Sequence, residues 1–451
     1  MNSILISLIV ALLVSGCTSA SGSATTSRSV SAITSTTAAV EPGASTTDAS
    51  VTSLTTSVPV VDRSADLAYL VREIERLHPD PFWRTDRELF TAEVDRLTEA
   101  ALDLSADEFA VEVMRLMTAF DGHSGVQAFQ LGWDVAQLQL YLFEEGTFVT
   151  RSVDDALVGS EVVAVNDVPI PAAQAALAEL VNYDNPRTID LNIPLHLVMP
   201  RLLRAAGLID GPATYTLTTP TGESVHLQPD VMPFDEYSEW LGHPSLGLPG
   251  ADSPSYLSNR GFAFWWDHLG DADLVHLHYN QVSSNSQDPV DLTNTSLASV
   301  AEAIDATLDA NSTARFVIDL RLNGGGNNQT YGPLLDLVTE RYADRCGLYV
   351  IIGRNTFSAA TNFATEVEQA TSAVFVGEET GGSPNLFGDT RLVVLPESRI
   401  RVHVSQRYWE FAGPEDDRLW IEPDLEVRPT AADYFSGRDA ALETIMAHTC
   451  A

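Results

Sequence analysis

The stretch that decides the fold is Phe316-Val317-Ile318-Asp319-Leu320-Arg321-Leu322-Asn323-Gly324-Gly325-Gly326. An apolar strand here runs directly into three glycines, and a helical segment follows them. Glycines at this point allow backbone N–H groups to turn toward a ligand without obstruction by side chains. The order strand, glycine turn, helix therefore indicates an α/β unit with a binding site beyond the carboxyl end of the strand.

A second strand end carries a candidate nucleophile. The run Tyr349-Val350-Ile351-Ile352-Gly353-Arg354-Asn355-Thr356-Phe357-Ser358-Ala359-Ala360 places Ser358 where a strand gives way to a helix. The free N–H groups and the dipole of a helix N-terminus favour an oxyanion. A glycine turn beside such a serine is the layout of an activated hydroxyl with an oxyanion hole. Two alternatives remain open: a helix N-cap role for Ser358, and a phosphate-binding role for the glycines.

Strands and helices alternate in the last part of the chain, which predicts an α/β layer with parallel strand pairing. A final section, 392–409, returns to a strand pattern. The predicted strands are 274–279, 315–320, 348–352 and 373–376, and the predicted helices lie near 291–309, 331–343 and 359–370.

Two regions precede this layer. Residues 64–122 have helical spacing, and the third predicted helix opens with a capping box from Ser105 to Glu108. From 127 to 230 the pattern changes to short strands, and the string 157–167 resembles part of a PDZ domain, with a generic small β-domain as the alternative. The predicted α/β, multidomain organisation is a helical domain (61–126), a PDZ-like domain (127–230), a connector (231–260) and an α/β core (261–451).

Composition excludes several functions. The chain has 451 residues, 62 acidic and 25 basic, with a formal net charge of −37, and every basic residue is an arginine. A surface this acidic repels phosphate backbones, so no nucleic-acid partner is expected. Without lysine, neither a lysine base nor the cation of a phosphate-binding loop is available.

Residues 1–16 have the features of a secretory signal peptide. The apolar run from Ile4 to Val14 is shorter than the ~20 residues of a membrane-spanning helix. Val14-Ser15-Gly16-Cys17 resembles a bacterial lipoprotein box, which implies lipid attachment at Cys17 and an extracytoplasmic, membrane-anchored protein. The alternative is an ordinary signal peptide. Of residues 18–60, 22 of 43 are Ser or Thr, so 17–60 is expected to be a flexible tether. Cys346 and Cys450 either pair or remain free thiols.

A serine nucleophile needs a base at neutral pH, and His123 is the candidate. It lies in Asp121-Gly122-His123-Ser124-Gly125, a glycine-flanked turn at the end of a predicted helix. The other histidines have ordinary explanations, and the pair His276 and His278 on one face of a strand is only a weak suggestion of metal ligands. Because no His-x-x-x-His or Cys-x-x-Cys spacing occurs, neither a metal nor another cofactor is expected.

Three motifs, in this order, resemble a serine peptidase family, the C-terminal-processing (tail-specific) proteases and the tricorn core. They are the segments 121–124, 317–326 and 356–360, and further similar segments are 376–382, 422–424 and 433–439. The resemblance covers about 64–451. It implies a helical N-terminal part, a PDZ-like insert and a crotonase/ClpP-like α/β catalytic core.

The resemblance also implies catalytic roles. Tail-specific members use a serine–lysine dyad, but here Ser383 stands where that lysine would be. The tricorn-like branch uses serine, histidine and an acid, which makes Ser358 the nucleophile and His123 its base. The oxyanion hole would consist of backbone N–H groups of Gly324 or Gly325 and of Ala359. The acid is expected among Glu415, Asp416 and Asp417, with Asp416 favoured.

The sequence thus predicts an exported, lipid-anchored serine endopeptidase that acts on polypeptides. One alternative is a cell-surface lipoprotein of the same fold that holds peptides or small ligands without turnover. The other is an esterase of small substrates. The oligomeric state and the cleavage preference do not follow from the sequence.

Overall fold

The structure is a computed structural model that describes residues 62–242, 254–288 and 292–449. The predicted signal peptide, Cys17 and the tether lie outside these residues, as do Cys450 and part of the predicted connector. No helix of the described ranges has both the length and the apolar character needed to cross a membrane.

The C-terminal part is built on a six-stranded sheet in the order β18-β15-β14-β13-β10-β9. All neighbours from β18 to β10 are parallel, and β9 pairs antiparallel with β10 at the edge. The predicted α/β layer with parallel pairing is therefore confirmed. The strands are β9 (Phe264–Leu269), β10 (Leu274–Tyr279), β13 (Arg315–Asp319), β14 (Leu348–Ile352), β15 (Val374–Gly377) and β18 (Leu425–Glu426).

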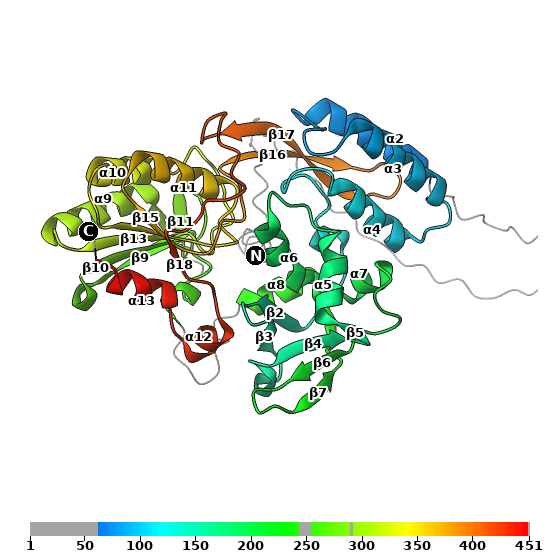
Figure 1. Cartoon of the computed structure of the whole chain (residues 1–451), viewed down its shortest axis with the longest axis horizontal. Helices are drawn as coiled ribbons and strands as arrows, with labels where there is room; N and C mark the ends of the chain where they lie inside the picture. Colours follow the sequence, from blue (N-terminus) through cyan, green and yellow to red (C-terminus); the bar gives the residue numbers. More distant parts are fainter. Residues whose placement is uncertain (1–61, 243–253, 289–291, 450–451) are drawn as a thin grey trace, which may run out of the picture.

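Helices cover both faces of this sheet (Figure 1). Three of them connect successive parallel strands and pack on one face: α9 (Leu297–Ala310), α10 (Gly332–Tyr342) and α11 (Ala359–Ala370). Helix α13 (Ala440–Ala447) packs on the other face, and the short α12 (Ala431–Ser436) precedes it. Because side chains alternate along a strand, Phe316 and Ile318 pack toward α9–α11, whereas Val317 packs toward Ile445 of α13.

The N-terminal helices form as their sequence predicts. Helix α4 (Ala106–Met117) begins with the predicted capping box, in which Ser105 and Glu108 bond each other's backbone N–H. Asp62 and Asp86 cap the other two helices, α2 (Arg63–Leu77) and α3 (Arg87–Ala100). Their apolar faces are buried in a common core. This helical unit ends close to the turn that carries His123.

Residues 135–242 contain a second, antiparallel sheet in the order β2-β3-β4-β6-β7, with β5 paired to β4. Each helix of this region begins at a proline or directly after one. The sequence pattern did not predict two of them, α6 (Pro186–Leu197) and α7 (Pro200–Ala205). No comparison tests the PDZ-like interpretation, which stays a prediction. The elements are β1 (Val135–Ala136), β2 (Leu138–Leu142), β3 (Thr147–Ser152), β4 (Glu161–Val165), β5 (Val168–Pro169), α5 (Ile170–Ala178), α6 (Pro186–Leu197), α7 (Pro200–Ala205), β6 (Tyr215–Thr218), β7 (Ser224–Leu227), β8 (Val231–Met232) and α8 (Phe234–Gly242).

A long hairpin links the two ends of the molecule (Figure 1). Its strands β16 (Asn385–Val394) and β17 (Arg401–Glu410) pair antiparallel, and a smaller hairpin is formed by β11 (Asn285–Gln287) and β12 (Asn294–Ser296). Val402 and Val404 of β17 are buried in the same core as Leu67 and Leu70 of α2. The hairpin therefore carries C-terminal sequence into the core of the N-terminal helices.

Candidate active site

Ser358 lies between β14 and α11, where the strand gives way to the helix. Its backbone has φ 54° and ψ −126°, a conformation that a residue with a side chain rarely adopts. Such strain costs about 1–3 kcal/mol and is concentrated at functional sites. Although Ser358 occupies the N-cap position, its hydroxyl makes no capping hydrogen bond. The ordinary role of a serine at this position is therefore absent.

The glycine turn after β13 packs directly against this serine. Gly325 has φ 109°, and a Cβ added there would lie 2.7 Å from Ser358 Cβ and 2.9 Å from the Phe357 carbonyl oxygen. Only glycine fits this position. Asn323 ties the two loops together, because its carbonyl oxygen accepts the Phe357 N–H at 3.2 Å.

Of the three backbone N–H groups expected to form the oxyanion hole, one already donates a hydrogen bond within the described part of the protein and two do not. The Gly325 N–H donates to Asn323 Oδ1 at 2.9 Å, so this N–H is already used. Neither a backbone nor a side-chain acceptor binds the Gly324 N–H among the described residues. The Ala359 N–H begins helix α11, where the first N–H groups have no intrahelical acceptor. Gly324 and Ala359 therefore remain as candidate donors.

His123 comes to this site from the other half of the molecule. The turn that carries it is joined to β17 by a bridge in which Gly125 and His403 exchange backbone hydrogen bonds of 2.8 and 2.9 Å. The His123 ring stacks on Phe357, the residue before Ser358, with ring centroids 4.4 Å apart. Within the described part of the chain, both buried ring nitrogens of His123 lack a hydrogen-bond partner. Ser358 and His123 are therefore not hydrogen-bonded to each other, and the contact between their two loops is the stacking of His123 on Phe357.

Two buried carboxylates flank His123. One ligand atom each from Asp121, His123 and Asp184 lies within 4.8 Å of the others. Asp121 is fully buried, and it accepts bonds from His78 Nε2 at 2.9 Å and from the His123 backbone N–H at 2.9 Å. The Ser124 and Ser405 hydroxyls also donate to it. These contacts fix Asp121, which in turn fixes the turn that carries His123.

Burial and neighbouring charges shift the pKa values of His123, Asp121 and Asp184 in different directions. Burial lowers the pKa of His123 to about 4, although the nearby Asp121 carboxylate opposes this shift. Burial by itself would raise the pKa of Asp121, but the hydrogen bond from His78 and the charge of His123 lower it to about 2. Burial, together with the charge of Asp121, raises the pKa of Asp184 to about 7. At neutral pH the imidazole is therefore neutral and able to accept a proton.

The structure does not bring Asp416 to His123. The Asp416 carboxylate binds the Arg418 guanidinium at 2.8 Å, and this hydrogen bond lowers its pKa. Arg418 also binds Glu368 of α11. The carboxylates beside His123 are instead Asp121 and Asp184. Asp121 stands two residues before His123 and was visible in the sequence, whereas nothing local marked Asp184. Ser383, at the position of the lysine of the dyad, donates to the Leu419 carbonyl oxygen.

A cavity of about 120 Å³ lies at the junction, with His123, Gly324 and Phe357 in its lining. Phe129, Leu191 and Leu195 contribute apolar side chains to the same lining. The cavity therefore places the candidate base and one candidate oxyanion donor beside an apolar surface.

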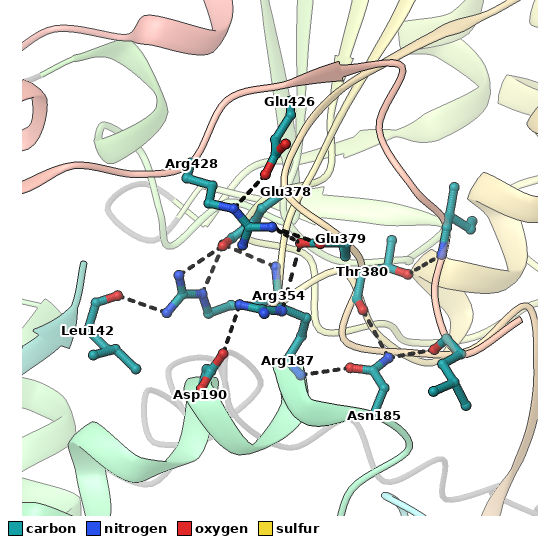
Figure 2. Close-up of polar contacts among 12 residues, drawn as sticks. Leu142, Asn185, Arg187, Asp190, Arg354, Glu378, Glu379, Thr380, Glu426 and Arg428 are labelled. Carbon is teal, nitrogen blue, oxygen red and sulfur yellow. Dashed lines mark hydrogen bonds and ion pairs between the residues drawn. The ribbon is translucent and has the colours of Figure 1, made fainter. Parts of the chain in front are cut away.

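A polar network fastens the loop before Ser358 to the antiparallel sheet (Figure 2). Arg354 forms a bidentate ion pair with Glu378, with bonds of 2.9 and 2.8 Å, and its third nitrogen donates to the Leu142 carbonyl oxygen at 2.8 Å. Asn185 at the start of α6 donates to the carbonyl oxygen of Thr380 at 3.0 Å. The network thus connects β2 and α6 to the loops after β14 and β15.

Cys346 is disulfide-bonded, which excludes a free thiol at this position. The other two cysteines, Cys17 and Cys450, lie outside the described residues.

Comparisons with known proteins identify the fold. No family model matches the sequence, and no curated protein matches it. Mature CPAF in complex with lactacystin has a TM-score of 0.61 at 14% identity, over 86% of this chain and 98% of that chain. Mature CPAF alone has a TM-score of 0.58 at 13% identity, over 85% of this chain and 96% of that chain. The photosystem II D1 C-terminal processing protease has a TM-score of 0.36 at 16% identity, over 84% of this chain and 98% of that chain. This likeness is weaker than the likeness to CPAF.

CPAF is a serine peptidase of the C-terminal-processing and tricorn type. The chain therefore has the α/β fold of that class, as its motifs predicted. At these identities the likeness shows the fold, and the activity has to be argued from the site.

Proposed function

We propose that this chain is a serine endopeptidase in which Ser358 is the nucleophile and His123 its general base. The environment of Ser358 carries the proposal. Ser358 is held in a strained backbone conformation against Gly325, its hydroxyl caps no helix, and His123 stacks on the adjacent Phe357. Backbone strain of this kind is concentrated at functional sites, where it can hold a reactive side chain in place.

The proton transfers follow from the protonation states. His123 is neutral at pH 7 and takes the proton of the Ser358 hydroxyl as its oxygen attacks the peptide carbonyl. It then gives this proton to the leaving amine, and the acyl-enzyme is hydrolysed by water in the reverse sequence. The ring moves into hydrogen-bond reach of the hydroxyl when substrate fills the site, because catalytic hydrogen bonds often tighten only in the complex.

The negative charge of the tetrahedral intermediate needs donors, and the imidazolium needs a carboxylate. The N–H groups of Gly324 and Ala359 are the proposed oxyanion hole. Asp121 is the proposed acid in place of Asp416, because it is ionised, immobilised and close to the His123 ring. Its role is to orient the imidazole and to stabilise its charged form.

The substrates proposed are polypeptides. In the cavity beside His123 and Gly324, the side chains of Phe129, Leu191 and Leu195 offer contacts to an apolar side chain near the scissile bond. Export and lipid attachment at Cys17 are part of the proposal on the strength of the sequence pattern alone. The lipid anchor would hold the enzyme at the outer face of the membrane, with residues 17–60 as the tether.

Hydrolysis of a casein-type substrate by the full-length protein tests this function. Ser358→Ala and His123→Ala are each expected to lower turnover by ~10⁴–10⁶-fold. Ser383→Ala is the matched control and is expected to cleave like wild type, because its hydroxyl bonds a loop carbonyl outside the proposed machinery.

Wild-type cleavage by either Ser358→Ala or His123→Ala would contradict the mechanism. Turnover of small acyl esters without peptide cleavage would identify an esterase. A folded wild-type protein that turns over neither substrate would favour the ligand-holding lipoprotein.

A further inference from the structure

A second cluster of titratable side chains lies on the sheet face covered by α13. His276 and His278 are alternate residues of β10, so both side chains point to this face. Asp319 ends the neighbouring strand β13, and the parallel register places it opposite His278. The cluster is separate from the Asp121, His123 and Asp184 group of the candidate active site.

The three side chains are buried, and one ring nitrogen of each histidine has no hydrogen-bond partner among the described residues. His276 and His278 are each 1% exposed, and Asp319 is 3% exposed. Within residues 62–242, 254–288 and 292–449, neither His276 Nε2 nor His278 Nε2 has a hydrogen-bond partner. A buried polar group without a hydrogen-bond partner lowers the stability of the fold by about 1–3 kcal/mol. Two such nitrogens side by side therefore indicate a bound ligand that would satisfy them.

The distances suit a small divalent cation. One ligand atom from each of the three residues lies within 4.8 Å of the other two, and His276 Nε2 is 3.6 Å from Asp319 Oδ2. A tetrahedral zinc ion with bonds of ~2.0–2.2 Å separates its ligand atoms by roughly 3.3–3.6 Å. This pair therefore already has the required spacing, and the ligand atom of His278 lies within 4.8 Å of both other ligand atoms.

Neighbouring side chains hold the candidate ligands in place. Trp265 of β9 stacks on the His278 ring at 3.8 Å with an interplanar angle of 6°, and the His276 ring lies 3.9 Å from that of His278. Arg321 donates to Asp319 at 3.0 Å and to Asp439 at 2.9 Å, so a second carboxylate offsets the guanidinium charge. Hydrogen bonds of this kind orient ligating carboxylates in metal sites.

We propose that His276, His278 and Asp319 form a binding site for one divalent transition-metal ion of the zinc type. Two imidazoles and a carboxylate are a ligand set for such ions, and water takes the fourth position. The ion would fasten β10 to the end of β13, directly before the turn that contains Gly324. The site is structural and does not depend on the proposed peptidase activity.

Calorimetric titration of the EDTA-treated, full-length protein with ZnCl₂ tests the proposal. The experiment is done in wild type and in His123→Ala, because the candidate active site also gathers a histidine and two carboxylates. One equivalent of Zn²⁺ is expected to bind in both proteins. His278→Gln is expected to weaken this binding by roughly 100-fold or more, and His268→Gln, an exposed histidine on β9, is the matched control.

A second measurement protects the test against a variant that fails to fold. Co²⁺ added to wild type and to His123→Ala is expected to give the visible absorption of a tetrahedral nitrogen-ligated ion, and Zn²⁺ is expected to raise the melting temperature of both. The proposal is overturned if Zn²⁺ does not bind with a micromolar or lower Kd. The proposal is also overturned if His123→Ala no longer binds Zn²⁺, or if folded His278→Gln binds Zn²⁺ as tightly as wild type.

Discussion

Replacing Arg354 by methionine tests how the loop before the candidate nucleophile is held. Arg354 stands four residues before Ser358, and its side chain is 8% exposed, against 5% for that of Glu378. The substitution keeps the volume and apolar stem of the side chain but leaves the Glu378 carboxylate buried without its counter-charge. It also removes the donor to the Leu142 carbonyl oxygen on β2.

The expected magnitude follows from these contacts. Removing one partner of a buried ion pair costs about 3–5 kcal/mol, and the unsatisfied carbonyl adds to this cost. We therefore expect Arg354→Met to lower the free energy of unfolding by about 4 kcal/mol. The double variant with Glu378→Met is expected to recover at least about 2 kcal/mol of this loss, because it removes the uncompensated charge. Arg96→Met is the control: its ion pairs are exposed, so a change below about 1 kcal/mol is expected.

Urea unfolding followed by tryptophan fluorescence measures these differences, and peptide turnover is measured on the same samples. Displacement of the loop by about 1 Å is expected to lower kcat about 10²-fold in Arg354→Met. The reasoning is refuted if Arg354→Met unfolds within about 1 kcal/mol of wild type. A double variant less stable than the single variant would also refute it.

Three further predictions concern the site. Gly325→Ala should lower kcat by at least ~10²-fold because the added Cβ would lie 2.7 Å from Ser358 Cβ. Gly332→Ala has open space around it and should not lower kcat, so equal activities of the two variants would contradict the role of this packing. Asp121→Asn should lower kcat by ~10²–10⁴-fold and shift the pH profile, and wild-type kinetics would remove Asp121 from the mechanism. In wild type, kcat/KM should rise with pH near 4 as His123 loses its proton, and again near 7 as Asp184 ionises and makes His123 more basic. Asp184→Asn should lack the second rise, and its persistence would assign that step elsewhere.

Much of the fold could be predicted because its signals are local. The glycine turn after β13, the capping box at Ser105 and the strand-to-helix change at Ser358 each depend on neighbouring residues only. The hairpin β16–β17 could not be predicted in the same way. Its place is set by burial of Val402 and Val404 against helices at the other end of the chain, which no local pattern encodes.

The residues of the candidate site follow from the sequence only in part. The flanking glycines single out His123, and in the structure its ring stacks on Phe357, the residue before Ser358. Asp184 was missed because it reaches the site only through a hydrogen bond to Gly122, distant in the sequence. Asp416 was favoured because the family resemblance implies an acid late in the chain, but in the structure the Asp416 carboxylate binds Arg418, which also binds Glu368. For Asp184 and Asp416, the deciding contacts exist only after folding.

The rate at which a fluorophosphonate labels the full-length protein tests the central claim most directly, because the reagent reacts much faster with a serine that a base activates than with an ordinary serine. Mass spectrometry of the intact protein and of its peptides is expected to show one adduct, on Ser358, and labelling at least ~10²-fold slower in His123→Ala. An adduct on another residue, or labelling of His123→Ala at the wild-type rate, would contradict the account.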